Sequence, residues 1–103
     1  HFIILEMRAY LSYQRLDWEM NYWRSTSQFE VDLLIGKELA IEVKATDRPQ
    51  AKHLKGLRAL AEEKIFKMLI CVHCGSFASL TEDGIELLPY HEFLSRLWSG
   101  QLC

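Results

Sequence analysis

The chain has 103 residues, of which 50% are hydrophobic, 12% aromatic and 25% charged. This length predicts one domain over residues 1–103, and the composition is too apolar for a disordered chain. No apolar stretch approaches the ~20 residues of a membrane span and no secretory signal is visible, so we expect a cytoplasmic protein without a membrane partner. The formal net charge of −2 gives no overall attraction to nucleic acid. Residues 44–67, however, hold seven basic and three acidic side chains, a local charge of +4.

The N-terminal part predicts an apolar helix over residues 1–14. Four side chains define its expected buried face: Phe2, Leu5, Ala9 and Tyr13. Other apolar side chains widen this face, so we expect the helix to be largely covered: Ile3, Ile4, Met7, Tyr10 and Leu11. The helix begins without a start methionine or a capping residue, and we therefore expect a fragment of a longer protein. Residues 20–24 then predict a strand that ends at a turn over 25–27.

A β-hairpin is predicted over residues 29–45. Apolar residues occupy every odd position in 29–35 and in 39–45, and the loop 36–38 separates the two strands. If the loop is symmetric, the numbers of paired residues add to 74, which sets Asp32 opposite Glu42. The same register gives three apolar pairs: Val31 with Val43, Leu33 with Ile41, and Ile35 with Leu39.

The second half of the chain predicts helices that alternate with strands. Pro49 opens a helix over about 50–64, and the apolar run 65–72 predicts a buried strand. This order of strand, helix and strand is typical of a crossover into a parallel pair. Residues 80–81 and 85–88 flank a turn at 82–84, and 89–98 predict a last helix. The fold class is therefore α/β (α+β), with a mixed sheet that has the 29–45 hairpin at its centre and helices beside it.

The three cysteines predict reduced thiols, because their number is odd and no secretory signal precedes them. Cys71 and Cys74 have the spacing of a zinc or redox pair. A zinc site would also have to recruit distant residues such as His91 and Cys103, and no helix opens after the pair as a redox motif would require. Cys71 continues an apolar strand, so we interpret it as a packed core thiol.

Charged residues gather on the polar face of the predicted hairpin. They are Glu30, Asp32, Glu42 and Lys44, three carboxylates and one ammonium group. Mg²⁺ or Mn²⁺ held by Asp32 and Glu42 would explain such close like charges, and Glu30 would be a secondary acid. A metal there favours attack of water on a phosphodiester, with Lys44 neutralising charge on the phosphoryl oxygens. The alternative is a solvated strand face whose ion pairs contribute little.

Further side chains either contact a nucleic acid or have only a structural or solvent-facing role. Lys52, Lys55 and Arg58 lie on the predicted 50–64 helix, where they either contact phosphates of a nucleic acid or simply face water. Trp23 and Arg24 have the chemistry to stack on a base, but an aromatic residue on a strand is more often part of the core.

Several stretches of the chain carry a resemblance to known families. The succession of elements, with Asp32 followed by Glu42-Val43-Lys44, resembles the PD-(D/E)XK nuclease-like superfamily and its αβββαβ core. The chain is also similar, over nearly its whole length, to the domain of unknown function found C-terminal to the AAA-type ATPase module of prokaryotic ATP-binding proteins. The stretches that carry this second resemblance are Tyr22-Trp23-Arg24-Ser25, Phe29-Glu30-Val31-Asp32, Ile41-Glu42-Val43-Lys44-Ala45-Thr46, His53-Leu54-Lys55-Gly56-Leu57 and Phe93-Leu94-Ser95-Arg96-Leu97-Trp98-Ser99-Gly100.

The resemblance implies a restriction-endonuclease-like fold with Asp32, Glu42 and Lys44 in the catalytic positions and a metal on the two acids. It also implies an ATPase module before residue 1, which alone would bind ATP, since no G-x-x-x-x-G-K-[ST] motif occurs here. In similar sequences a glutamate of the first helix falls just before His1. Glu6 is no obvious substitute for that glutamate, because six residues rotate a helix by ~240°.

Two functions remain open from the sequence. One is hydrolysis of DNA by a divalent-metal-dependent nuclease. The other is an inactive nuclease-fold module that binds nucleic acid or a protein and regulates the attached ATPase. DNA binding by this chain is expected to be weak and strongly salt-dependent, and oligomers are expected only through the longer protein.

Overall fold

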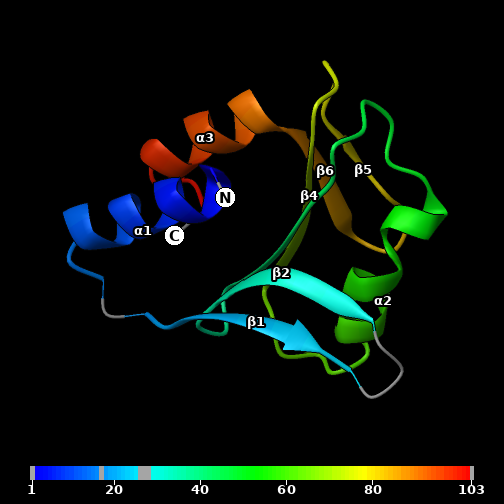
Figure 1. The fold of residues 1–103 in the computed structure, drawn as a ribbon, viewed down its shortest axis with the longest axis horizontal. Helices are drawn as coiled ribbons and strands as arrows, with labels where there is room; N and C mark the ends of the chain where they lie inside the picture. The colour runs from blue at the N-terminus through cyan, green and yellow to red at the C-terminus, as the bar shows by residue number, and fades with distance from the viewer. Residues whose placement is uncertain (1, 17, 26–28, 103) are drawn as a thin grey trace.

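A computed structural model describes residues 2–16, 18–25 and 29–102 as a mixed α+β fold (Figure 1). Its helices are α1 (Phe2–Tyr13), α2 (Lys55–Ala61) and α3 (Tyr90–Trp98), with a short 3-10 helix at Ala51–His53. The described strands form one six-stranded sheet: β1 (Met20–Arg24), β2 (Glu30–Ile35), β3 (Leu39–Val43), β4 (Met68–His73), β5 (Ser79–Leu80) and β6 (Ile85–Pro89).

The strands lie in the order β1-β2-β3-β4-β6-β5. The pairs β1–β2, β2–β3 and β5–β6 are antiparallel, whereas β3–β4 and β4–β6 are parallel. The prediction of a mixed sheet with a parallel pair after the hairpin is therefore confirmed. The hairpin strands β2 and β3 lie inside the sheet, and the carboxyl ends of β3, β4 and β6 lie at one common edge.

The two faces of the sheet carry separate hydrophobic clusters. Helices α1 and α3 lie together over one face (Figure 1), where Met7, Ile41 and Phe93 are fully buried in the larger cluster. Helix α2 covers part of the other face, where Leu57 and Ala40 belong to the smaller cluster. The apolar run of β4 from Met68 to Val72 is explained by this cover on both faces.

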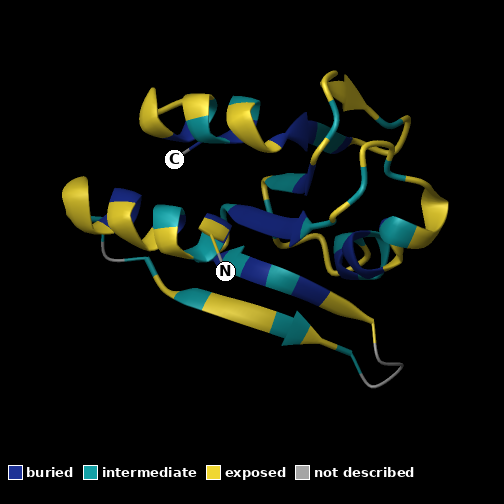
Figure 2. Cartoon of the chain, turned by 45° about the horizontal axis from the view of Figure 1, so that its top comes forward, coloured by how far each residue is buried: buried dark blue, intermediate teal, exposed yellow. Residues whose placement is uncertain are grey.

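The predicted buried face of α1 is wrong. Phe2, Leu5 and Tyr13 are 56%, 61% and 75% exposed, and Ala9 is exposed as well. The buried residues are instead those that only widened the predicted stripe: Ile3, Met7, Tyr10 and Leu11. Because α1 has apolar side chains nearly all round but rests on the sheet and α3 from one side only, one apolar face stays open (Figure 2). His1, the expected first residue of this helix, lies outside the described residues.

The hairpin register is confirmed near the turn and broken at its open end. Leu33 pairs with Ile41 and Ile35 with Leu39, around a turn at 36–38. The described pairing of β2 and β3 ends at Leu33 and Ile41, so neither the predicted pair Val31–Val43 nor the predicted pair Asp32–Glu42 forms. The turn predicted over 25–27 lies mostly outside the described residues.

A β-bulge in β2 explains the broken register. Between the β1–β2 pairs Asn21–Leu34 and Trp23–Val31, β1 has one residue and β2 has two, Asp32 and Leu33. The extra residue reverses the alternation, so Val31 packs in the α2 cluster while Leu33 packs under α1 and α3.

The helix predicted over 50–64 is shorter and interrupted. The amide of Gln50 donates to Nδ1 of His53, which closes a 3-10 turn, and α2 begins only at Lys55. Lys64, with a φ of 55°, ends this region, and β4 therefore starts at Met68 rather than at residue 65. The 79–89 hairpin and the last helix agree with prediction to within about one residue. Among the described residues, no helix combines the length and apolarity needed to cross a membrane.

Candidate functional site

The predicted acids and lysine meet on the α2 side of the sheet. Asp32 lies in the bulge of β2, Glu42 lies in β3 and Lys44 follows β3. They line a pocket of about 260 Å³, here named the acid pocket. Its other charged or polar side chains are Glu30 of β2, Lys52 and His53 of the 3-10 helix, and Lys55 at the start of α2. Three segments far apart in the sequence thus bring two acids and several basic groups to one hollow.

The Asp32 side chain takes over a backbone hydrogen bond of the hairpin. Its Oδ2 accepts the amide hydrogen of Val43 at 2.9 Å. The register expected from the sequence would give that amide a carbonyl of β2 instead, which the bulge moves away. The carboxylate is therefore fixed beside β3, and its second oxygen is left for another partner.

Glu42 is the buried acid of the pair, with only 4% of its surface exposed. The pKa of Glu42 is raised from its ordinary value of 4.5 to about 8, mainly by burial and also by the hydrogen bond to Asp32 and the negative charge of Asp32. The positive charge of Lys44 opposes this shift. Glu42 therefore holds a proton near neutral pH when no cation is present.

Gly56 brings α2 next to the acids. A Cβ atom at this position would lie 1.9 Å from the backbone oxygen of Glu30, which is far inside van der Waals contact. Only glycine lets the helix backbone lie this close to β2. This contact places Lys52 and Lys55 in the wall of the acid pocket.

Other predicted site residues are engaged elsewhere. Glu30 lines the rim of the acid pocket but forms an ion pair with Arg24 at 3.2 Å. Arg58 does not line the pocket, because its Nε bonds Oδ2 of Asp83 at 2.8 Å. Trp23 is partly buried against the α2 cluster, which confirms the interpretation as a core residue.

The interpretation of Cys71 as a packed thiol is confirmed. Cys71 is fully buried in the α2 cluster and pairs with Glu42 across β3 and β4. Burial, followed by the charge of Glu42, raises the pKa of the Cys71 thiol to about 12. The group is therefore a protonated thiol at neutral pH, whereas a nucleophile or metal ligand needs a thiolate. Cys74 is exposed, and Cys103 lies outside the described residues.

Sequence reasoning missed two contributors to this site. No motif in the sequence assigns a role to His53, but it lines the acid pocket, and its Nδ1 accepts the Gln50 amide hydrogen, so its proton lies on Nε2. Gly56 was not singled out. A glycine inside a predicted helix, where it costs about 1 kcal/mol relative to alanine, is the local feature that indicates a close backbone approach.

The donor set suits a hard divalent cation. Two carboxylates lie side by side, and Mg²⁺ is often bound by one or two carboxylates together with water. The lysines that also line the pocket suit the oxygens of a phosphate group. The acid pocket can therefore hold a cation at the acids together with an anionic phosphoryl group at the lysines.

The profile of the family described as "Domain of unknown function (DUF4143)" matches residues 1–93. Neither a curated protein nor a solved structure matches the chain. The family match includes β1 to β6, both acids and the segment that leads into α2. Because it spans most of the sequence, the chain belongs to the DUF4143 family.

Proposed function

We propose that the acid pocket hydrolyses phosphodiester bonds of DNA with the help of Mg²⁺ or Mn²⁺. The observation that carries this proposal is the pair Asp32 and Glu42, two acids in contact at the wall of an open pocket that also holds Lys44. A solvated strand face would leave both carboxylates in water, but Glu42 is buried. Such burial of an acid beside another acid is costly and is typical of a functional site.

Asp32 and Glu42 would hold the cation. One carboxylate oxygen of Asp32 is not engaged by the Val43 amide, and Glu42 would lose its proton when the cation binds. When bound, the cation would supply a Lewis acid for the phosphoryl oxygen and lower the pKa of a bound water.

The basic residues of the pocket would hold the phosphate. The ammonium group of Lys44 would neutralise negative charge that develops on the phosphoryl oxygens. Lys52 and Lys55 would bind neighbouring phosphates, and Nε2 of His53 would donate a hydrogen bond.

The proposal includes the assignment of a restriction-endonuclease-like fold. The order of one helix, three strands, helix and strand from α1 to β4 supports a restriction-endonuclease-like core, and the resemblance of the Asp32, Glu42 and Lys44 pattern to PD-(D/E)XK nucleases supports its activity. On the same resemblance, the domain would act beside an AAA-type ATPase module that alone binds ATP.

The direct test is cleavage of single- and double-stranded DNA with Mg²⁺ or Mn²⁺. We expect cleavage that a chelator stops and that Lys44→Ala reduces by at least ~100-fold, since loss of one preorganised charge-stabilising group typically costs 10²–10³ in rate. Lys37→Ala, in the exposed hairpin turn, is the matched control and should leave the rate unchanged. Equal activity of the Lys44 and Lys37 variants would contradict the assigned role of Lys44.

Metal binding can be tested without a substrate. Mg²⁺ or Mn²⁺ should raise the melting temperature of the wild type, because a ligand that binds only the folded state stabilises it. Asp32→Asn should abolish the rise, while its amide oxygen can still accept the Val43 hydrogen bond. A rise that persists in Asp32→Asn would remove this residue from the metal site.

The inactive regulatory module is the second candidate. It is favoured by the structural use of Asp32, whose carboxylate already closes the hairpin through the Val43 amide. Under this hypothesis the acids only shape the domain, and it binds nucleic acid or a protein partner without cleavage. No metal response and no cleavage, together with salt-dependent DNA binding, would select it over the enzyme.

A further inference from the structure

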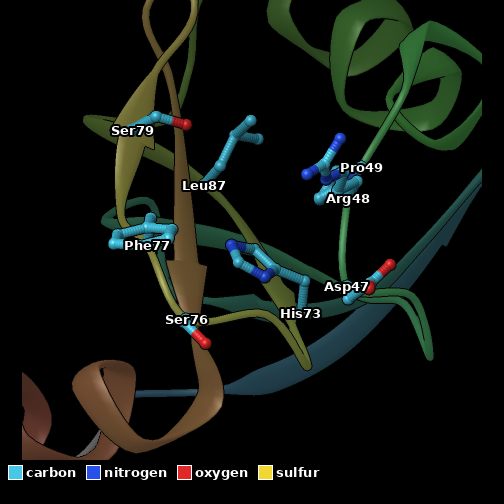
Figure 3. A pocket seen from close by; sticks show the side chains of 8 residues that line it. All are labelled: Asp47, Arg48, Pro49, His73, Ser76, Phe77, Ser79 and Leu87. Atoms are coloured by element: carbon cyan, nitrogen blue, oxygen red, sulfur yellow. The ribbon is translucent and has the colours of Figure 1, made fainter.

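A second pocket opens beside the acid pocket at the carboxyl ends of the parallel strands. It has a volume of about 230 Å³ and is here named the histidine pocket. Six of its lining residues define it: Asp47, Arg48, His73, Ser76, Phe77 and Ser79 (Figure 3). None of these residues has a role in the proposed cleavage, so the pocket requires an explanation of its own.

His73 is a buried side chain with one unused donor. Only 3% of its surface is exposed, and its Nδ1 accepts the Gly75 amide hydrogen at 2.9 Å. A nitrogen that accepts this bond carries no proton, so the proton of the neutral ring lies on Nε2. Because Nδ1 is occupied by an amide, Asp47 cannot orient this ring as the base of a Ser–His–Asp arrangement.

The unused donor faces the pocket. Within the described part of the chain, Nε2 of His73 has no hydrogen-bond partner. Every side-chain nitrogen or oxygen in that part that is inaccessible to solvent does have a partner. Nε2 is therefore reached from the pocket and not enclosed in the core. In Figure 3 the ring extends from β4 into the hollow that Phe77 and Leu87 border.

The remaining polar groups also favour an anion. Arg48 forms no ion pair with any described carboxylate, and its guanidinium group lies over the hollow (Figure 3). The Ser79 hydroxyl lies on the opposite side, and the Asp47 carboxylate points away from the imidazole. An imidazole N–H, a guanidinium group and a hydroxyl are the donors that bind phosphate oxygens.

Backbone pairing links the two pockets. The amide of Lys44 donates to the oxygen of Val72 at 2.9 Å, and the amide of Cys74 donates to the oxygen of Thr46 at 2.8 Å. His73 therefore lies between two bonds to the segment that starts at Lys44 and leads to Arg48. A close backbone contact fixes this arrangement, since a Cβ atom on Gly75 would lie 2.3 Å from the backbone oxygen of Asp47.

We propose that the histidine pocket binds a phosphate group through Nε2 of His73, the Arg48 guanidinium group and the Ser79 hydroxyl. The ligand is a phosphate monoester, a backbone diester or free phosphate, because all three present the same oxygens. Phe77, which is 84% exposed at the rim, would stack on a base if that phosphate belongs to a nucleotide. This site does not depend on cleavage or on a metal.

Titration of the protein with inorganic phosphate, followed by amide and imidazole NMR signals, tests the proposal. We expect saturable shifts of the Gly75 amide and of His73 Nε2 that sodium chloride at equal ionic strength does not reproduce. Arg48→Gln should weaken phosphate binding about tenfold, since a charge-assisted hydrogen bond is lost. Arg15→Gln, an exposed arginine after α1, should not change it. Shifts that chloride reproduces, or that centre on Gly56, would overturn the proposal.

Two histidine variants separate ligand binding from folding. His73→Asn keeps an acceptor for the Gly75 amide but has no donor that reaches as far as Nε2, so it should fold and lose phosphate binding. His73→Gln places an amide N–H near the former Nε2 and should keep part of the affinity. Asp32→Asn should bind phosphate like the wild type, which separates this site from the acid pocket. Undiminished binding by a folded His73→Asn protein would contradict the assignment.

The source of the phosphate is resolved with short oligonucleotides that carry or lack a terminal 5′-phosphate. If inorganic phosphate displaces either oligonucleotide, the site is supported and its ligand is a nucleic acid. A preference for the phosphorylated oligonucleotide shows that the site binds the 5′ end of a nucleic-acid strand. Phe77→Ala should then weaken oligonucleotide binding but not inorganic phosphate binding. Binding of inorganic phosphate alone supports a site for the free anion or a small monoester.

Discussion

The two faces of the sheet differ in how completely helices cover them. Helices α1 and α3 together cover one face, and the cluster beneath them consists of buried apolar side chains such as Ile35 and Phe93. Helix α2 has seven residues and covers only part of the other face. The uncovered part holds both the acid pocket and the histidine pocket, at the carboxyl ends of β3 and β4.

This difference separates stability from candidate chemistry. The α1/α3 face excludes water and supplies most of the apolar burial, which stabilises the fold. The α2 face keeps polar groups at the sheet edge, where open α/β sheets generally bind their ligands. Substitutions on the first face should therefore change unfolding, and substitutions on the second face should mainly change the properties of the pockets.

The largest expected effect is on the α1/α3 face. Phe93 has no exposed surface, and Phe93→Ala should lower the free energy of unfolding by about 3–5 kcal/mol through lost burial and a cavity. Denaturant unfolding measures the change. Below its melting transition, the variant should keep the metal response of the acid pocket. A loss under ~1 kcal/mol would show that this face does not dominate stability.

The next effect is a dependence of stability on pH in the metal-free protein. The pKa of Glu42 is about 8 in the fold against an ordinary value of 4.5, so between these values the folded state holds a proton that the unfolded chain has released. Stability should therefore fall as pH rises from 4.5 to 8, by on the order of a few kcal/mol. Denaturant unfolding with a chelator measures it, and Glu42→Gln should flatten the profile. A wild-type profile as flat as that of the variant would be incompatible with a buried Glu42.

A smaller effect tests the contact that shapes the acid pocket. Gly56→Ala puts a Cβ against the backbone oxygen of Glu30, so α2 must move, at a cost of about 1–3 kcal/mol. The metal response should weaken with it. Ala59→Gly changes helix propensity in the same helix without this clash, and it should leave the metal response intact. Equal metal responses in the two variants would show that the close approach is unimportant for the acid pocket.

The smallest effect is expected at the exposed ion pair of Arg58 and Asp83. The hydrogen bonds from Arg58 and Thr81 lower the pKa of Asp83 from 3.8 to about 2. The stabilisation is therefore present above pH 3.8 and is lost as pH falls through 2. Acid unfolding of Asp83→Asn should differ only slightly from the wild type, since water screens the pair. A large difference near neutral pH would contradict this assignment.

The sequence by itself determined most elements and their pairing near the turns. Alternating apolar residues predicted the pairs Leu33–Ile41 and Ile35–Leu39, because a slip by one residue would turn the apolar side chains to the wrong face. The same pattern predicted that Asp32, Glu42 and Lys44 share one face, and all three line the acid pocket, although the bulge replaces the predicted pairing of Asp32 with Glu42. Local periodicity is sufficient for such predictions, since neighbouring strands are joined by short turns.

Only the tertiary structure decided three other features. Helix α1 is apolar on most sides, so its own pattern could not select a buried face, and its contact with α3 and the sheet selected Met7 over Leu5. The bulge at Asp32 depends on pairing with β1, which no periodicity within β2 reveals. The histidine pocket joins His73 to Arg48, 25 positions earlier in the sequence, because parallel strands bring their carboxyl ends to one edge.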